Sequence, residues 1–292
     1  MFEKVLFPTD FSEFSYRMLD CITQLPGIRE IVLLHIIDAT HPSLHGWTRE
    51  PERELARTVM EELRKTLVGR GVPAGTYVEV ITEGDMHQKI LAIAEREEPS
   101  LVVMGTHQKT PFDVLLHGSV SYDMLHSLDI HVLIMRQSDT EDADDQVPGD
   151  LCRMILSKVL VTTDLSENSV AMLSLVRGIP GIGEIHILHV VPEGACREET
   201  EEQTGRAREE LGKIRQDLEQ AGIRAGTHLR VADPAAGIRE VAEGIDASLI
   251  IMGAHRKGWA GEYLIRSNIH EVVKKAKRPV LILRPGKESR KE

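Results

Sequence analysis

The feature that most constrains the fold of this chain is an internal duplication. "KVLFPTDFSEFS" (4–15) returns as "KVLVTTDLSENS" (158–169), and "EIVLLHIID" (30–38) returns as "EIHILHVVP" (184–192), both with a shift of 154 residues. A chain of 292 residues is long enough for two domains of ordinary size. The sequence therefore predicts two tandem copies of one domain.

The later part of each copy repeats with a shorter shift of 148 residues. "ILAIAEREEPSLVVMGTH" (90–107) matches "IREVAEGIDASLIIMGAH" (238–255), and "HVLIMR" (131–136) matches "PVLILR" (279–284). The second copy is thus shorter between its second and third apolar runs, where the first copy carries "ATHPSLHGWTRE" (39–50). Both copies otherwise keep the same order of segments.

The stretch between the copies differs in composition from both of them. "QSDTEDADDQVPGD" has five acidic residues within 139–145 and no aromatic residue, which is typical of a solvated linker. We predict four segments: a first domain at 1–137 that binds the ligand, an acidic linker at 138–153, a second domain at 154–285 and a charged tail at 286–292.

Within each copy, short apolar runs alternate with longer amphipathic segments. Consecutive Val, Ile and Leu bounded by turn residues are typical of strands buried on both faces. In the first copy we predict strands at 4–8, 31–37, 76–82, 100–104 and 131–135, and helices at 12–25, 51–69, 86–97 and 115–127. The alternation predicts an α/β fold in which each copy is a doubly wound, five-stranded parallel sheet of order 3-2-1-4-5, with helices on both faces.

Composition narrows the classes of partner and the compartment. The net charge of −11 argues against nucleic acid or anionic membranes as partners. Cys21, Cys152 and Cys196 are far apart without a CxxC pair, so we expect neither a disulfide framework nor a zinc site. The first residues do not resemble a signal peptide, and the apolar runs are too short to span a bilayer. We predict a cytoplasmic protein.

Two loops are candidates for a ligand site. In a sheet of this order, ligands bind beyond the carboxyl ends of the strands where the order reverses, between strands one and four. Those strands end at "FPTD" (7–10) and "VMGTH" (103–107). Gly118 and Ser119 open the next predicted helix, whose backbone N–H groups attract anions. The same spacing also fits an ordinary strand-to-helix turn with a serine N-cap, and spacing does not distinguish the two.

The quoted segments together resemble a known family. "VLFPTDFSEFS", "VLLHIID", "VVMGTHQKT", "LLHGSV" and the final "HVLIMR" resemble a universal stress protein domain, and the resemblance covers nearly the whole chain twice. It implies a tandem member that binds an adenine nucleotide (ATP, ADP or AMP), with or without Mg²⁺, as a stress-response sensor or switch. The family pattern for this site is G-x2-G-x9-G-[ST].

The resemblance also implies which residues contact the nucleotide. Asp10 would meet the adenosine, Pro8 and Thr9 would shape the strand end, and Ile36 would meet the adenine through its backbone. The ribose and phosphates would lie along Met104, Gly105, Thr106, His107, Gln108, Lys109, Gly118, Ser119 and Val120. It assigns no catalytic residue and no protein metal ligand.

Both copies depart from the family pattern. The first has Gln108 where the second glycine is expected, which would weaken binding or shift it from ATP towards AMP or ADP. The second keeps Asp164, Val190, Gly253 and Ser267 but has Arg256 and Arg266 at two glycine positions. We expect its site to be degenerate, without a bound triphosphate, although two arginines could still bind another anion.

Other readings of the same residues stay open. The chain could be a nucleotide-independent scaffold for an unknown protein partner, with "HVLIMR" and "PVLILR" pairing as an intrachain pseudo-dimer and a homodimer possible beyond that. A slow ATP hydrolase ranks last, because no water-activating base is evident beside the phosphates.

Other candidate residues have simpler interpretations. His41 and His45 have a spacing that two metal ligands can share on a helix, but Pro42 and Gly46 oppose a helix there. We interpret His35 and His189 as buried, hydrogen-bonded structural residues. The charged segment 197–220 is typical of a solvated helix.

Overall fold

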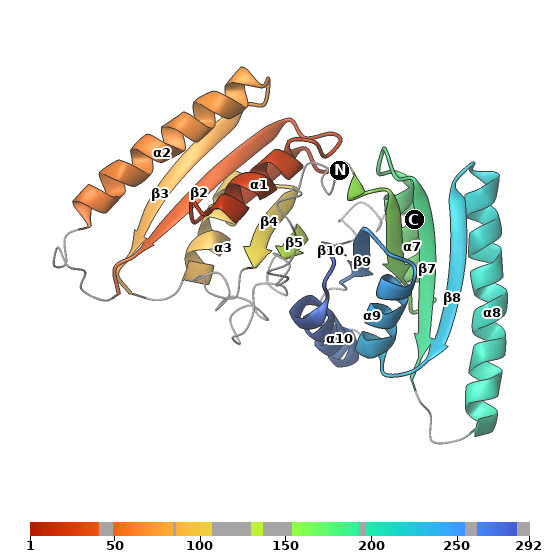
Figure 1. Ribbon diagram of the computed structural model, residues 1–292. Coiled ribbons are helices and arrows are strands. Elements are labelled where there is room, and N and C mark those ends of the chain that lie inside the picture. Colours follow the sequence, from red (N-terminus) through yellow and green to blue (C-terminus); the bar gives the residue numbers. More distant parts are fainter. Residues whose placement is uncertain are drawn as a thin grey trace. The chain divides into compact units, whose positions relative to one another are not determined.

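The computed structural model describes residues 1–40, 49–83, 86–106, 130–136, 154–192, 197–254 and 262–284. The chain divides into two compact units, Met1–Asp139 (unit 1) and Thr140–Glu292 (unit 2). Each unit is an α/β domain (Figure 1). The helix predicted at 115–127, the acidic linker and the charged tail lie outside the described residues.

Unit 1 has the predicted topology. Its strands follow the order β3-β2-β1-β4-β5, and every neighbouring pair is parallel. Its elements are β1 (Lys4–Pro8), α1 (Glu13–Ile22), β2 (Glu30–Asp38), α2 (Glu50–Gly69), β3 (Ala74–Ile81), α3 (Met86–Glu97), β4 (Leu101–Thr106) and β5 (His131–Arg136).

Unit 2 repeats this topology, with the parallel order β8-β7-β6-β9-β10. Helices α8 and α9 lie on opposite sides of β7 and β8, as right-handed crossovers require (Figure 1). Its elements are β6 (Lys158–Thr162), α7 (Glu167–Arg177), β7 (Glu184–Val191), α8 (Arg197–Gln220), β8 (Arg224–Val231), α9 (Pro234–Gly244), β9 (Leu249–Gly253), α10 (Glu262–Lys275) and β10 (Val280–Leu283).

The central strands carry the core of each unit. Leu6 and Phe7 of β1 and Leu33 and Leu34 of β2 are at most 1% exposed, so consecutive side chains are buried on both faces of the sheet. Edge strand β3 is only half-buried along most of its length. The apolar runs of the sequence therefore form the central strands. The packed core around these strands fixes the strand ends that border the site.

Serine side chains start the first helix of each unit. Ser12 caps α1 by accepting a hydrogen bond from the Ser15 N–H, and Ser166 caps α7 by accepting one from the Ser169 N–H. Such a cap contributes about 1 kcal/mol. Pro51 lies in the first turn of α2, as its fixed φ favours. The predicted starts of the helices at 12–25 and 51–69 are confirmed to within one residue.

Cysteine pairing departs from expectation. Cys21, near the end of α1, is buried and disulfide-bonded, so the expectation of no disulfide is wrong. Cys152 and Cys196 lie outside the described residues. Sequence separation does not reveal which cysteines approach closely, because a disulfide requires only that the folded chain bring two Cα atoms within about 7 Å.

The long helix α8 is solvated, as predicted. Arg206 pairs with Glu202 and Arg215 with Glu219, each four residues apart, and all four side chains are exposed. Among the helices that the structure describes, none is long and apolar enough to cross a membrane.

Candidate functional site

The carboxyl ends of three strands meet at one edge of the unit 1 sheet. Strand β1 lies between β2 and β4, with Pro8 opposite Leu34 of β2 and Leu6 opposite Val102 of β4. The order of the strands reverses at β1, and doubly wound sheets bind their ligands beyond the strand ends at such a point.

Asp10 follows β1 at this edge and is held by the start of α1. Its Oδ1 accepts hydrogen bonds from the Ser12 N–H at 3.0 Å and the Ser15 hydroxyl at 2.5 Å. Within the described residues, no donor reaches its Oδ2. Burial raises the pKa of Asp10, but the hydrogen bonds from Ser15 and Ser12 outweigh burial and hold the pKa below its ordinary value. Asp10 is therefore ionised at neutral pH and keeps one carboxylate oxygen as an acceptor.

The residue after this aspartate has a strained backbone in both units. Phe11 has φ 61° and Leu165 has φ 62°, in the left-handed region that non-glycine residues seldom adopt. The Thr9 hydroxyl accepts a hydrogen bond from the Phe11 N–H at 3.2 Å, and the Thr163 hydroxyl accepts one from the Leu165 N–H at 3.0 Å. The strain is about 1–2 kcal/mol per residue. In each unit it is offset by the hydrogen bond to the threonine hydroxyl.

A histidine on the second strand braces the same turn. His35 Nδ1–H donates to the Thr9 carbonyl at 2.8 Å, and the Phe11 ring stacks on the His35 ring at 4.0 Å. Burial lowers the pKa of His35, and this outweighs the opposing effects of the Thr9 carbonyl and the Asp10 charge. His189 makes the same 2.8 Å bond to the Thr163 carbonyl. The predicted hydrogen bonds of both histidines are confirmed, although each side chain is half-buried rather than fully buried.

The glycine at the end of the fourth strand lets the first helix pack against that strand. A Cβ at Gly105 would lie 2.2 Å from Met18 Cε and 3.0 Å from Phe14 Cε1 of α1. A Cβ at Gly253 would lie 2.7 Å from Met172 Sδ of α7. These glycines leave room for a methionine of the first helix, which gives each of them a role in packing.

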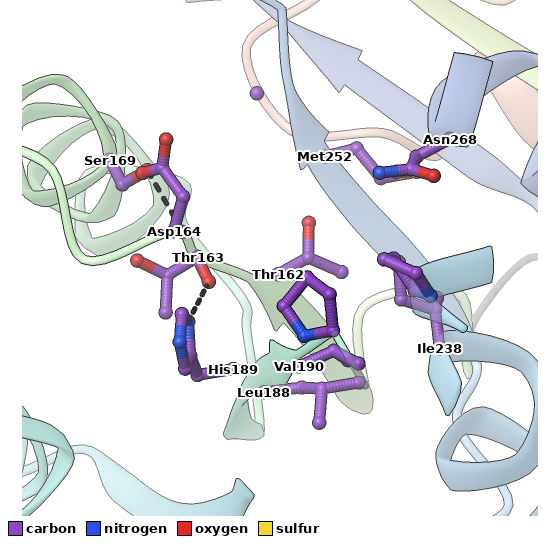
Figure 2. A pocket seen from close by; sticks show the side chains of 13 residues that line it. Thr162, Thr163, Asp164, Ser169, Leu188, His189, Val190, Ile238, Met252 and Asn268 are labelled. Atoms are coloured by element: carbon purple, nitrogen blue, oxygen red, sulfur yellow. Dashed lines mark hydrogen bonds between the residues drawn. The ribbon is translucent and has the colours of Figure 1, made fainter. Parts of the chain in front are cut away.

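Unit 2 has a pocket at its corresponding edge (Figure 2). The pocket has a volume of 250 Å³ and is lined by residues from β6, β7, β9, α9 and α10. Leu188, Val190, Ile238 and Met252 give it apolar walls, and Asp164 adds a carboxylate. Asp164 is held as Asp10 is, because its Oδ1 accepts hydrogen bonds from the Ser166 N–H and hydroxyl and from the Ser169 hydroxyl.

The lining of this pocket corresponds by repeat to the predicted site of unit 1. Asp164 stands at the position of Asp10, Val190 at that of Ile36, and the end of β9 at that of β4. The cavity thus lies in unit 2, at the repeat positions of the contacts that were predicted for unit 1.

The sequence matches the universal stress protein family over residues 1–136 and 156–284. The chain belongs to that family. The two matched segments agree with a tandem universal stress protein, one domain in each unit.

A curated relative agrees with this assignment, and a solved structure that covers the whole chain agrees with the fold. Universal stress protein MJ0577 of Methanocaldococcus jannaschii is 28% identical over 162 residues, which are 48% of this chain and 98% of that protein. The crystal structure of a universal stress protein from Archaeoglobus fulgidus covers 98% of both chains at 23% identity, with a TM-score of 0.69. Another structure from that organism, in complex with dAMP, is 25% identical over 44% of this chain and 98% of that chain, with a TM-score of 0.31.

The structure describes part of the predicted nucleotide site of this universal stress protein. Thr9 and Met104 are buried, Asp10 is partly exposed, and Ile36 lies in β2 near its end. Pro8 and Thr106 are the last residues of β1 and β4, and Gly105 precedes Thr106. The predicted phosphate contacts His107, Gln108, Lys109, Gly118, Ser119 and Val120 lie outside the described residues.

Sequence reasoning missed several residues that build this edge. Ser15 fixes Asp10, Phe11 covers His35, and Met18 occupies the space that Gly105 leaves. The repeat offered a signal for Ser15, because "DFSEFS" and "DLSENS" keep both serines at the same spacing from the aspartate.

Metal ligation has no support from the described part of the chain. There, no group of three or more His, Cys, Asp or Glu side chains is arranged to hold a metal ion. His41 and His45 lie outside the described residues.

Proposed function

We propose that this universal stress protein binds an adenine nucleotide at the strand-end edge of unit 1 and acts as a stress-response sensor or switch. The observation that carries the proposal is the pocket of unit 2, because its lining stands at the repeat positions of the predicted unit 1 contacts. A cytoplasmic location is part of the same proposal.

The chemistry of the described unit 1 residues supports an adenosine group there. An ionised Asp10, whose Oδ2 meets no donor among the described residues, can accept hydrogen bonds from ribose hydroxyls or an amino group. The backbone of Ile36, near the end of β2, can meet the adenine. In the sequence, Gly118 and Ser119 supply the backbone N–H and hydroxyl donors that phosphates require.

The length of the phosphate chain depends on residues that differ between the units. Gln108 replaces one glycine of the family pattern in unit 1, so we propose AMP or ADP as better ligands than ATP. Unit 2 has Arg256 and Arg266 at two glycine positions, so we propose that its pocket accepts no triphosphate. Magnesium would accompany only the longer phosphate chains.

One observation favours a second candidate, a nucleotide-independent scaffold. Gly105 and Gly253 have a packing reason, since a Cβ at either would crowd a methionine of the first helix. These motif glycines would therefore be kept in a protein that binds no nucleotide. In that case the fold serves to present surfaces to partners. The proposed contacts are the pairing of the final strands of the two units and a homodimer.

The test is to denature freshly purified protein and identify any released nucleotide by chromatography and mass spectrometry. Calorimetric titration of stripped protein with AMP, ADP and ATP follows, with Gly118→Arg as the variant because it copies the residue of unit 2. We expect about one nucleotide per chain, lost in the variant. No released nucleotide and no heat with any of the three would support the scaffold instead.

A further inference from the structure

Two histidines of unit 2 face each other across neighbouring strands, away from the strand-end site. His186 Nδ1 of β7 lies 2.8 Å from His228 Nε2 of edge strand β8, with the ring planes 23° apart. Glu184 Oε1 lies 3.2 Å from the other nitrogen of His186, Nε2. The two imidazoles are hydrogen-bonded across the two strands, and Glu184 lies within ion-pair distance of His186.

Space for this pair comes from a glycine. Gly226 is the register partner of His186, and a Cβ there would lie 2.7 Å from His186 Nδ1. In unit 1 the corresponding positions hold Val32 and Tyr77, so the histidine pair belongs to unit 2 alone.

The pair can hold only a limited number of protons. A hydrogen bond between two imidazoles needs one nitrogen with a proton and one without. With both rings neutral, one of the two facing nitrogens, His186 Nδ1 or His228 Nε2, carries a proton and donates it to the other. One added proton is compatible with the bond. A second added proton leaves two N–H groups pointing at each other, which breaks the bond and places two cations in contact.

The surroundings of the pair disfavour the second proton. On the same face of the sheet lie Lys158 of β6, whose Nζ donates to the Ile245 carbonyl, and Arg224 and Arg230 of β8. Against these three cations, the strands contribute one carboxylate, Glu184. Burial lowers the pKa of His228, and the charges of His186 and Arg230 lower it further.

The helix that covers this face adds no buried charge. A Cβ at Gly237 of α9 would lie 3.3 Å from Val190, which points to the same face as His186. The charged residues Arg239, Glu240 and Glu243 of α9 are half-buried or exposed. The residues that α9 buries are all uncharged: Ala235, Gly237, Ile238, Val241 and Ala242.

We propose that the hydrogen-bonded pair His186–His228 is a pH-sensitive latch, which fastens edge strand β8 to β7 at neutral pH and releases it when both imidazoles are protonated. The register partner of His228 is Leu188, which lines the pocket of unit 2. Release of the latch therefore loosens a wall of that pocket.

The direction of the pH effect follows from the lowered pKa of His228. A histidine that resists protonation in the folded state stabilises the fold fully above its unfolded pKa of about 6.5. That stabilisation is lost as the pH falls from there through the folded pKa. We therefore expect acid to weaken unit 2 in a way that depends on this pair.

Thermal unfolding of the full chain at pH 8 and pH 5.5 tests the latch, with His228→Tyr as the matched variant because tyrosine is the residue of unit 1. We expect the Tm of the wild type to fall by about 2–4 °C more than that of the variant on acidification. An equal fall in both proteins would overturn the proposal.

A second measurement needs no variant and so does not depend on whether His228→Tyr folds. Nitrogen chemical shifts of the imidazoles in the wild-type protein report where each proton sits. We expect one of the two facing nitrogens, His186 Nδ1 or His228 Nε2, to carry a proton at pH 8 and the other to be unprotonated. Protons on both facing nitrogens, or on neither, at pH 8 would contradict a latch.

Discussion

The two units are alike at the carboxyl ends of their central strands and differ at their outermost strands, β3 and β8. In both, an aspartate is held by two serines, a left-handed residue follows, and a histidine donates to a threonine carbonyl. At the outer strand, unit 1 joins Tyr77 and Lys4 through Glu97 of α3, whereas unit 2 has the histidine pair.

The equivalent lysines of the two units, Lys4 and Lys158, have different partners. Lys4 Nζ of unit 1 lies 3.0 Å from the Glu97 carboxylate, while Lys158 Nζ of unit 2 donates to the backbone carbonyl of Ile245, which replaces Glu97. The repeat thus retained the contacts that position the ligand edge and exchanged those that fasten the outer strand. The contacts at the carboxyl ends of the strands, and not those of the outer strand, are therefore the ones that the two units have in common.

The largest effect on stability is expected from filling the glycine of the fourth strand. Gly105→Val crowds both Met18 and Phe14, and Gly253→Val crowds Met172. We expect each to destabilise its unit by about 1–3 kcal/mol, with the larger loss at Gly105. Urea unfolding of both variants measures this. A smaller loss at Gly105 than at Gly253 would break the packing account.

The serine caps should matter equally in the two units. Ser12→Ala and Ser166→Ala each remove the acceptor for an N–H of the first helical turn and a contact of the serine pair that holds the aspartate. We expect a loss of about 1 kcal/mol for each, measured by urea unfolding. Unequal losses would show that the two edges are not equivalent.

The smallest effect is expected at the outer strand of unit 1. Tyr77→Phe removes the 2.5 Å hydrogen bond to Glu97 but keeps the ring beneath Arg96. We expect a loss of about 0.5–1.5 kcal/mol in unfolding free energy. No measurable loss would mean that the Glu97 contacts do not distinguish unit 1 from unit 2.

Much of the fold could be predicted because a buried strand can be recognised from its own residues. Strands such as β1 and β2 are covered on both faces and therefore appear as unbroken apolar runs. The second copy of the sequence contains the corresponding runs, which supports the same assignment. The aspartate turn was predictable for a similar reason, since Asp10 and Ser12 are neighbours in the sequence and bond locally.

The features that the sequence did not predict depend on contacts between segments that are far apart in the chain. The contact of Gly105 with Met18, and the pairing of His186 with His228 across strand register, both join segments far apart in the chain. Positive φ at Phe11 was also hidden, because nothing in a phenylalanine favours that region.

Calorimetric titration of AMP into a matched pair of variants, Asp10→Asn and Asp164→Asn, tests the central claim most directly. Asparagine keeps the size of the side chain but removes the charged acceptor at one edge while leaving the other intact. A charge-assisted hydrogen bond contributes about 1.5–3 kcal/mol, so we predict about 10-fold to 100-fold weaker binding for Asp10→Asn and unchanged binding for Asp164→Asn. Weaker binding in Asp164→Asn alone would contradict the assignment and place the nucleotide in unit 2.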